Sequence, residues 1–414
     1  MPHRLPGHRA PHCAGSVGLR LLHGAAAPPT SMQADSRQCP HACAGSMAVM
    51  KVHLLPPGEL DPTLIARWRA LRDAPDGASA LRSPFFAPEF AQLVGEVRPR
   101  SRIAVIECEG AVAGFHAFEP GALGMAVPLC AHMSDAHAPL IDPRISLDPS
   151  VWLKACGIRS WRFDHLPAGM PGFEAYETDQ VSAWLLRLDK GFAAYRTAIE
   201  ARSTWIRRTA AKLRRLERQF GPLRFEPHTQ DPRAWDQLVA WKSAQYRRSG
   251  LVDNFSIAWV RAYLERLREA ASPGLSAMMS ALYAGDKLAA VHLGMRSERV
   301  WHHYLPTYDR ELASLSPGLG LLLRMAEHAP SIGIDTIDFS SGDMEYKRSA
   351  STDCIPLMQG AVESGWLRAS RFQARRTVTR LRASPPILNT ARRARRAGVA
   401  LLNAARSGAS ALRP

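Results

Sequence analysis

The chain has 414 residues, more than one ordinary domain of roughly 100 to 200 residues, so two compact lobes are expected. Apolar residues make up 46% of it, and no apolar run reaches the roughly 20 residues that a membrane-spanning helix needs. These features, with seven scattered cysteines, favour a soluble protein of the reducing cytoplasm over a membrane protein or a disulfide framework.

The net charge of +16 is concentrated at the two ends of the chain. Residues 364–414 contain twelve Arg and no acidic residue, residues 1–46 contribute +3, and residues 47–363 carry only +1. Nucleic-acid binding needs a basic face within the folded part, so we expect no nucleic-acid partner. The Arg-rich end either contacts an anionic membrane or a membrane synthase, or it forms a disordered tail.

Residues 1–46 are rich in Ala, Gly, Pro, His and Ser and lack helical or strand periodicity, so we expect a disordered leader. Met47 and Met50 directly precede the first structured segment, and either could be the true start of translation. Residues 47–190 form the first predicted lobe, of mixed strands and helices. Its expected strands are residues 51–55, 102–107, 111–118, 160–165 and 181–188, and its expected helix is residues 62–71.

Residues 191–366 form the second predicted lobe, and residues 367–414 form the Arg-rich tail, with helix-compatible pieces at 367–382 and 388–405. The order of two helices, a three-stranded meander, a glycine-opened helix and a strand is the most informative pattern in the chain. The lobe's expected helices are residues 191–220, 232–247, 257–271 and 317–329, and its expected strands are 223–226, 275–283, 288–296, 300–305 and 334–339.

The glycine-opened helix follows the motif Ser316-Pro317-Gly318-Leu319-Gly320. Ser suits an N-cap, Pro suits the first helical position, and Gly lets a ligand approach the backbone. A helix that begins in this way presents N–H groups and the positive end of its dipole, which suits a pyrophosphate. A simple turn before a helix is the alternative.

Several motifs together resemble the CelD/BcsL-type acetyltransferases, which are associated with cellulose and exopolysaccharide synthesis. They are residues 304–310, Ser316-Pro317-Gly318, Gly333, Ile337-Asp338-Phe339 and residues 342–347. This group belongs to the GNAT superfamily and is similar to the FemAB-type double-GNAT fold. The resemblance covers about residues 52–366. It implies an α+β fold of two GNAT-like lobes, with mixed, mostly antiparallel sheets flanked by helices.

The resemblance also implies acyl transfer from acetyl-CoA or another acyl-CoA to a small polar or sugar-type acceptor, at nitrogen or oxygen. Such a reaction needs an N–H donor for the oxyanion, a base for the nucleophile and an acid for the leaving thiolate. Among the expected cofactor contacts are Ser316, Gly318, Leu319 and Gly320 at the phosphates and His303 and Leu305 on the strand. Asp338 or Glu345 is expected as base, Tyr304 or Tyr346 as acid, and Asp135 and Lys347 as substrate contacts.

Each of these assignments has a structural alternative. Asp338 could cap the turn at residues 340–342, Glu345 and Lys347 could form an ion pair, and the tyrosines could only pack. Alternation along a strand sends the adjacent His302 and His303 to opposite faces, so one of them should face the cleft. Because no HxH or HExxH pattern accompanies them, no metal is expected.

Two other functions are compatible with the same motifs. One is a Fem-type aminoacyl transferase that uses charged tRNA, which the near-neutral charge of residues 47–363 disfavours. The other is a non-catalytic GNAT-like regulatory subunit of a polysaccharide synthase, because turns and caps also explain the motif glycines and carboxylates.

Overall fold

The computed structural model describes residues 50–74, 79–146 and 148–363. The predicted leader, residues 1–46, and the predicted tail, residues 367–414, lie outside them. No helix in the described ranges is long and apolar enough to cross a membrane. The strands are β1 (Met50–Leu55), β2 (Arg102–Cys108), β3 (Ala111–Pro120), β4 (Met125–Pro128), β5 (Leu140–Ile141), β6 (Ser160–Pro167), β7 (Glu177–Arg187), β8 (Leu223–Glu226), β9 (Ser276–Ala284), β10 (Lys287–Arg296), β11 (Val300–Tyr308), β12 (Thr336–Asp338) and β13 (Asp353–Glu363). The α-helices are α1 (Pro62–Arg72), α2 (Pro88–Val97), α3 (Pro149–Ala155), α4 (Gly191–Glu200), α5 (Trp205–Phe220), α6 (Pro232–Arg248), α7 (Ala258–Arg268), α8 (Pro317–His328) and α9 (Glu345–Ala350).

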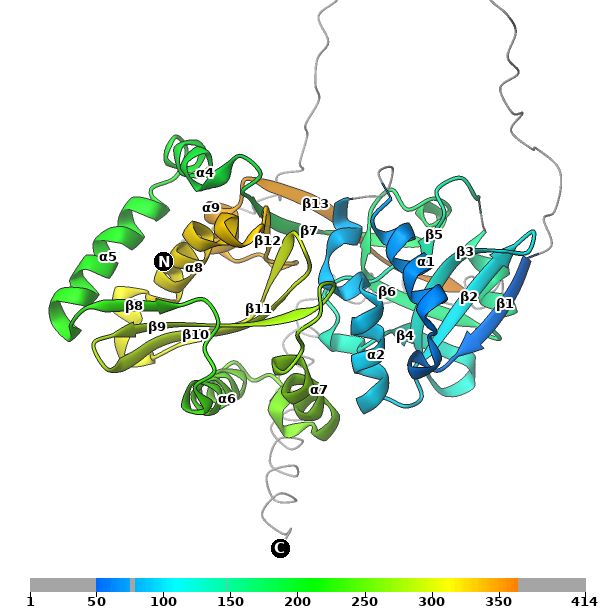
Figure 1. Ribbon diagram of the computed structural model, residues 1–414, viewed down its shortest axis with the longest axis horizontal. Helices are drawn as coiled ribbons and strands as arrows, with labels where there is room; N and C mark the ends of the chain where they lie inside the picture. The colour runs from blue at the N-terminus through cyan, green and yellow to red at the C-terminus, as the bar shows by residue number, and fades with distance from the viewer. Residues whose placement is uncertain (1–49, 75–78, 147, 364–414) are drawn as a thin grey trace, which may run out of the picture. The chain divides into compact units, whose positions relative to one another are not determined.

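The strands form one continuous sheet in the order β1-β2-β3-β4-β6-β13-β7-β12-β11-β10-β9-β8, with β5 paired to β3 (Figure 1). Its two halves repeat one connectivity: a strand, two helices, a three-stranded meander, a helix and a further strand. The first half runs from β1 to β6 and the second from β8 to β12. In both halves the last strand pairs parallel with the last strand of the meander.

The two halves are joined by β7 and β13. β13 lies between β6 and β7 and is antiparallel to both, and β7 pairs with β12 on its other side. β13, the last described strand, therefore extends the sheet of the first half. β7, which precedes the second half in the sequence, extends the sheet of the second half. β13 was not predicted from the sequence, because Pro356 interrupts a segment that lacks clean alternation.

Helices cover both faces of the second half-sheet. α5 and α8 lie on one face of β8 to β11, and α6 and α7 lie on the other (Figure 1). The α6 and α7 side shares a hydrophobic core with α1 and α2, in which Trp68, Phe90 and Tyr263 are buried. The apolar stripes of helices from both halves therefore meet in one core.

The predicted hairpin, the predicted meander and the predicted glycine-opened helix are confirmed. The hairpin β2–β3 turns at Glu109 and Gly110, with φ angles of +53° and +80°, which suits a tight hairpin turn. The meander β9–β11 and helix α8 also lie where the sequence predicts them. The expected strand at residues 334–339 is shorter, Thr336–Asp338, because Ser340 has a φ of +55° and ends the extended backbone.

The prediction of one helix over residues 191–220 is wrong: the segment forms α4 and α5, separated by residues 201–204. The Ser203 hydroxyl accepts a hydrogen bond from the backbone N–H of Trp205 at 3.3 Å. Ser side chains that bond the local backbone in this way compete with helical hydrogen bonding. The break lets α4 bury Tyr195 while α5 buries Leu213.

Candidate functional site

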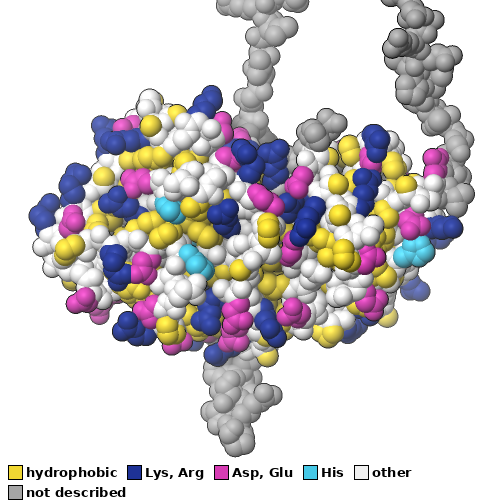
Figure 2. Space-filling view, in the orientation of Figure 1, with side chains coloured by type: hydrophobic (Ala, Val, Ile, Leu, Met, Phe, Trp, Pro, Cys, Tyr) yellow, Lys and Arg dark blue, Asp and Glu magenta, His cyan; other side chains and the backbone are white. Residues whose placement is uncertain are grey.

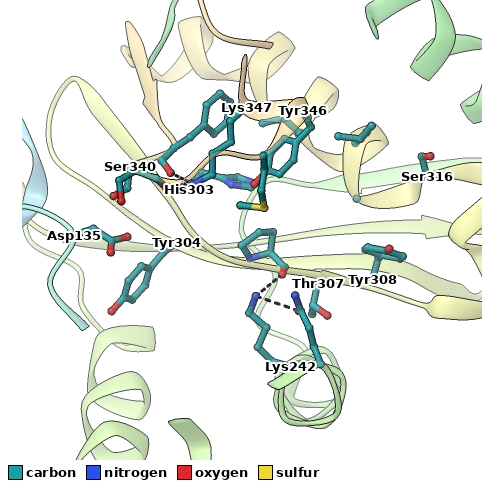
Figure 3. Close-up of a pocket in the computed structure, with 18 of the residues that line it drawn as sticks. Asp135, Lys242, His303, Tyr304, Thr307, Tyr308, Ser316, Ser340, Tyr346 and Lys347 are labelled. Atoms are coloured by element: carbon teal, nitrogen blue, oxygen red, sulfur yellow. Dashed lines mark hydrogen bonds between the residues drawn. The ribbon is translucent and has the colours of Figure 1, made fainter. Parts of the chain in front are cut away.

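A cavity of about 500 Å³ lies between β11, α6, α8 and α9. Figure 3 shows Asp135 and Tyr304 at one end, Ser316 at the other, and Lys242 rising from α6 on the side of β11 opposite Tyr346 and Lys347. Of the residues predicted from the sequence, the cavity is lined by Asp135, His303, Tyr304, Ser316, Gly318, Leu319, Tyr346 and Lys347.

One edge of β11 opens onto this cavity. β12 pairs with β11 only from Val300 to His302, although β11 continues to Tyr308. On the opposite edge, the pairing with β10 contains an irregularity that places His303 and Tyr304 across from Gly294. A bulge of this kind re-aims the backbone beside a functional site. No described strand pairs with residues 303–308 on the β12 side, so that edge can pair with an extended ligand.

Gly294 permits this bulge. A Cβ at that position would overlap the His292 imidazole and would lie 2.6 Å from the backbone oxygen of His302. The His292 ring occupies this space, and its Nε2 accepts the backbone N–H of Tyr304 at 3.2 Å. The backbone at the bulge is therefore held by a side chain of the neighbouring strand.

The α8 N-terminus differs from the predicted side-chain cap. Ser316 stands at the N-cap with a left-handed φ of +49°, and its side chain caps no backbone N–H group. Instead its Oγ accepts a hydrogen bond from Lys212 Nζ of α5 at 2.7 Å. Aspartates cap the N-termini of α1, α3 and α6, whereas α2, α4, α5, α7 and α9 have no side-chain cap, like α8. Helix α8 thus presents an uncapped positive dipole end beside a lysine, which suits an anion.

The two motif glycines have different surroundings. Gly318 lines the cavity, and a Cβ there would lie 3.2 Å from the ring of Tyr308. Gly320 faces away from the cavity: a Cβ there would overlap Leu213 of α5, and its N–H is bonded to Ser316 O at 3.1 Å. Leu305, also expected at the cofactor, is buried in the hydrophobic core. The close packing of α8 on α5 therefore explains Gly320 without a ligand.

A buried imidazole connects Asp135 and Asp338. His302 Nε2 lies 3.0 Å from Asp135 Oδ2, and its Nδ1 lies 3.6 Å from Asp338 Oδ2. Burial alone would lower the pKa of His302, but the two carboxylates outweigh burial and raise it to about 9. Burial alone would raise the pKa of Asp135, but the interactions with His302, His165 and Lys347 outweigh burial and hold this pKa below its ordinary value. At neutral pH, an imidazolium therefore holds an ionised Asp135 at the cavity.

Asp338 does not line the cavity with Asp135. Its Oδ1 accepts the backbone N–H of Ser340 at 2.7 Å, so it caps the following turn, as the structural alternative expected. The other expected base, Glu345, is exposed at the start of α9 and borders a neighbouring groove with Arg208 and Lys212. Among the predicted carboxylates, only Asp135 lines the cavity within the described ranges.

The adjacent histidines of β11 face opposite sides, as alternation predicts. His303 lines the cavity and stacks on His292, with ring centroids 4.6 Å apart. Burial lowers the pKa of His292 to about 3, aided by the charges of His302 and Lys242. Burial, with His292 and nearby cations, also places the pKa of His303 well below its ordinary value. Both rings are therefore neutral.

The two tyrosines expected as acids are differently bound. The Tyr304 hydroxyl donates a hydrogen bond to the backbone oxygen of Met133 and is thereby fixed to the first half of the chain. Tyr346 lines the cavity from α9, and burial raises its pKa to about 12. Lys347 donates to the backbone oxygens of Phe339 and Ser341 and forms no ion pair with Glu345. Tyr346 therefore has the phenol available to a ligand, whereas Lys347 fixes the loop after β12.

Lys242 of α6 was not predicted from the sequence. It is only 8% exposed and lines the cavity, and its Nζ donates to Pro306 O at 3.0 Å. A signal was present, because Trp235, Leu238 and Lys242 recur at spacings of three and four residues on the buried stripe of the helix. A lysine on an otherwise apolar, buried stripe is unusual, and it indicates a role in binding.

Basic side chains also gather on α5, at the left edge of the face in Figure 2. The helix buries Ile206 and Leu213 and exposes Arg207, Arg208 and Arg214. Its first half, from Trp205 to Lys212, borders a second groove, of about 800 Å³, that adjoins the cavity at Leu319 and Tyr346. In the described ranges, no cluster of three or more His, Cys, Asp or Glu side chains could hold a metal ion.

Residues 202–348 match the family model of the acetyltransferase (GNAT) domain. No curated protein matches the chain in sequence. Among solved structures, FemX aligns with a TM-score of 0.51 at 9% identity, over 75% of this chain and 96% of FemX. A conserved protein of unknown function from Bacteroides thetaiotaomicron gives 0.48 at 11% identity, over 77% of this chain and 100% of that one. A tandem GNAT protein from the clavulanic acid biosynthesis pathway gives 0.43 at 12% identity, over 76% and 99%.

The family match contains the meander, α8 and β12, and the alignment with FemX shows a common fold. The chain therefore has a GNAT fold, a mixed sheet flanked by helices, as the sequence predicted, and residues 202–348 match the acetyltransferase (GNAT) domain. The finer resemblance to the CelD/BcsL-type group stays a prediction.

Proposed function

We propose that this protein transfers an acyl group from a CoA thioester to the nitrogen or oxygen of a small polar or sugar-type acceptor. The observation that carries the proposal is that the uncapped start of α8, the unpaired edge of β11 and the Tyr346 hydroxyl all border one cavity. GNAT domains usually use acyl-CoA, and these three features match its phosphates, its amide-bearing arm and its leaving sulfur.

The residues present fit an acyl-CoA. The Gly318 N–H and the Lys212 ammonium suit the diphosphate, because a helix dipole and a lysine both favour anions. The unpaired edge of β11 offers backbone groups that can pair with the amides of the pantetheine arm and can donate to the thioester oxygen. The Tyr304 N–H is not among these donors, since it is already bonded to His292.

The chemistry then follows from the side chains. The acceptor nitrogen or oxygen attacks the thioester carbonyl carbon, a C–N or C–O bond forms, and the C–S bond breaks. Asp135, ionised and held by His302, takes the proton of the nucleophile. Tyr346, which stays protonated because burial raises its pKa to about 12, gives a proton to the departing thiolate.

Several finer parts of the proposal rest on sequence alone. The resemblance to CelD/BcsL-type proteins suggests an acceptor from cellulose, exopolysaccharide or other cell-surface metabolism, handled in the cytoplasm. The Arg-rich residues 367–414 would then contact an anionic membrane or a membrane synthase. The charge of only +1 over residues 47–363 supports a CoA donor over charged tRNA.

Calorimetric titration of the full-length protein with acetyl-CoA and longer acyl-CoAs tests the donor. Micromolar binding that is lost in Gly318→Glu, with circular dichroism unchanged, is the expected result, because the new carboxylate repels the diphosphate. If no acyl-CoA binds the wild-type protein, the proposal fails, and a tRNA donor or a regulatory role takes its place.

A further inference from the structure

Lys242 lies in the cavity without a carboxylate partner. Its Nζ donates to Pro306 O at 3.0 Å and lies 3.3 Å from Gln245 Oε1, and both acceptors are uncharged. The ring centroid of Tyr246 lies 5.7 Å away. No described carboxylate forms an ion pair with this ammonium, although the residue is only 8% exposed.

Two other buried cations, Arg72 and His302, have carboxylate partners, whereas Lys347, which lines the same cavity as Lys242, likewise donates only to backbone oxygens. Arg72, 2% exposed, hydrogen-bonds to Asp73 and Glu298, and His302 lies between Asp135 and Asp338. Burying an ammonium without a counter-ion is costly, and side chains normally avoid it through pairing. The position of Lys242 is therefore better explained by an anion that arrives with a ligand than by stability.

The charges around the cavity leave a positive excess. Lys242 and Lys347 line it and His302 lies behind, against the carboxylates of Asp135 and Asp338. His292 and His303, which lie between these groups, are neutral. Burial and the charge of Lys347 lower the pKa of Lys242 to about 8, so its ammonium still predominates at pH 7.

The acyl donor does not supply this anion. Its phosphates belong at the start of α8, beside Lys212, whereas Lys242 comes from α6 on the opposite side of β11 (Figure 3). Asp135 lines the same cavity, so a second ligand can place its nucleophile near Asp135 and an anionic group at Lys242.

Building on the proposed function, we infer that the acceptor carries an oxyanion, a carboxylate or a phosphate, and that Lys242 binds it. The acceptor is then a small molecule with a nucleophilic amine or hydroxyl at one end and this anion at the other. An uncharged sugar would leave Lys242 unpaired.

Matched acceptor pairs test this inference on the full-length protein, with release of the CoA thiol as the readout. Glucosamine is compared with glucosamine 6-phosphate, and amino acids are compared with their amides. We expect kcat/KM to be at least tenfold higher for the anionic member, and we expect Lys242→Met to abolish that preference through KM. Lys242→Arg keeps the charge and should retain the preference. Lys287→Met, which removes a surface lysine paired with Asp309 and Glu311, is the matched control and should change nothing.

Binding of inorganic phosphate, measured by calorimetry, gives a readout that needs no turnover. Wild type should show a binding component that Lys242→Met lacks and Lys287→Met keeps, while acetyl-CoA binds all three equally. Lys242→Met should also raise the midpoint of thermal unfolding, because it removes an unpaired buried charge. The inference is overturned if wild type and Lys242→Met bind phosphate equally. It is also overturned if wild type has the same kcat/KM for the neutral and the anionic member of each acceptor pair, even when acyl-CoA binds normally. Failure of acyl-CoA to bind would instead count against the proposed function.

Discussion

The imidazole of His302 and the carboxylate of Asp135 meet at 3.0 Å although 167 positions separate them in the chain. His302 comes from β11 of the second half, and Asp135 comes from the loop after β4 of the first half. The pair connects the two halves beside the cavity, so each half supplies part of the proposed site.

Asp135→Asn should lower kcat by roughly 100-fold or more, the range that general-base catalysis contributes, because an amide cannot take up the proton. The dissociation constant for acetyl-CoA should not change, since α8 and β11 are untouched. Steady-state kinetics and calorimetry measure the two quantities. Asp286→Asn, in the exposed turn between β9 and β10, is the matched control. An unchanged kcat in Asp135→Asn would remove the residue from the mechanism.

His302→Gln should change the pH profile of acyl transfer as well as its rate. In wild type, kcat at saturating acceptor should fall above a pKa of about 9, where the imidazolium loses the proton that holds Asp135. The variant keeps a donor for Asp135 but cannot titrate, so this alkaline limb should disappear. A variant that keeps the limb would assign it to another group.

The same titration should appear in stability. The native pKa of His302 is raised from 6.5 to about 9, so the native state holds a proton that the unfolded state releases between these values. This contribution, on the order of 3 kcal/mol, is fully present below pH 6.5 and is lost as pH rises through 9. Urea unfolding from pH 6 to 10, with His302→Gln for comparison, measures it. Parallel curves for the two proteins would contradict the assignment.

Tyr346→Phe should lower kcat by roughly 100-fold while leaving acetyl-CoA binding intact, because the phenyl ring fills the site but cannot protonate the thiolate. Tyr304→Phe should act differently. Its hydroxyl bonds Met133 O, so its loss should lower stability by about 1 kcal/mol with a smaller effect on kcat. The rates and denaturation curves of the two variants distinguish a catalytic role from a structural one. If Tyr304→Phe lost activity and Tyr346→Phe lost only stability, Tyr304 would be the acid.

Gly320→Ala should destabilise the protein by about 1 to 3 kcal/mol, because the new Cβ overlaps Leu213. Gly318→Ala faces Tyr308 at 3.2 Å and should change stability less. The double variant Gly320→Ala with Leu213→Ala should recover part of the loss, since it removes the overlapping side chain. Thermal unfolding measures all three, and a Gly320→Ala protein as stable as wild type would refute the close α5–α8 contact.

Acid should destabilise the protein below pH 6.5. Burial lowers the native pKa values of His116, His137 and His292 to about 3, and the rings of His137 and His292 accept backbone N–H groups that require their neutral forms. As pH falls from 6.5 towards 3, the unfolded chain binds protons that the native chain does not, at about 1.4 kcal/mol per pH unit for each group. Urea unfolding at pH 7, 6 and 5 should show this loss, and a flat profile would contradict it.

The sequence by itself determined the local elements and the class of protein. Alternation over residues 275–305 predicted the meander, and Pro317 and Gly318 marked the start of α8, because turn and helix signals act over a few residues. The motifs from residue 304 to residue 347 indicated a GNAT domain, which the family match confirms over residues 202–348. The break between α4 and α5 was missed, since the helical periodicity on both sides is continuous.

Only the tertiary structure decided which of these residues meet. Asp338 and Glu345 carry the same chemistry as Asp135 in the sequence, yet one caps a turn, one faces solvent, and only Asp135 lines the cavity. Gly318 and Gly320 are two residues apart, yet only Gly318 lines the cavity, whereas Gly320 packs against Leu213. Lys242 could be recognised as a cavity residue only from the structure, in which it bonds the backbone oxygen of Pro306, 64 residues further along the chain. Such contacts depend on packing over long sequence separations, which short-range patterns do not encode.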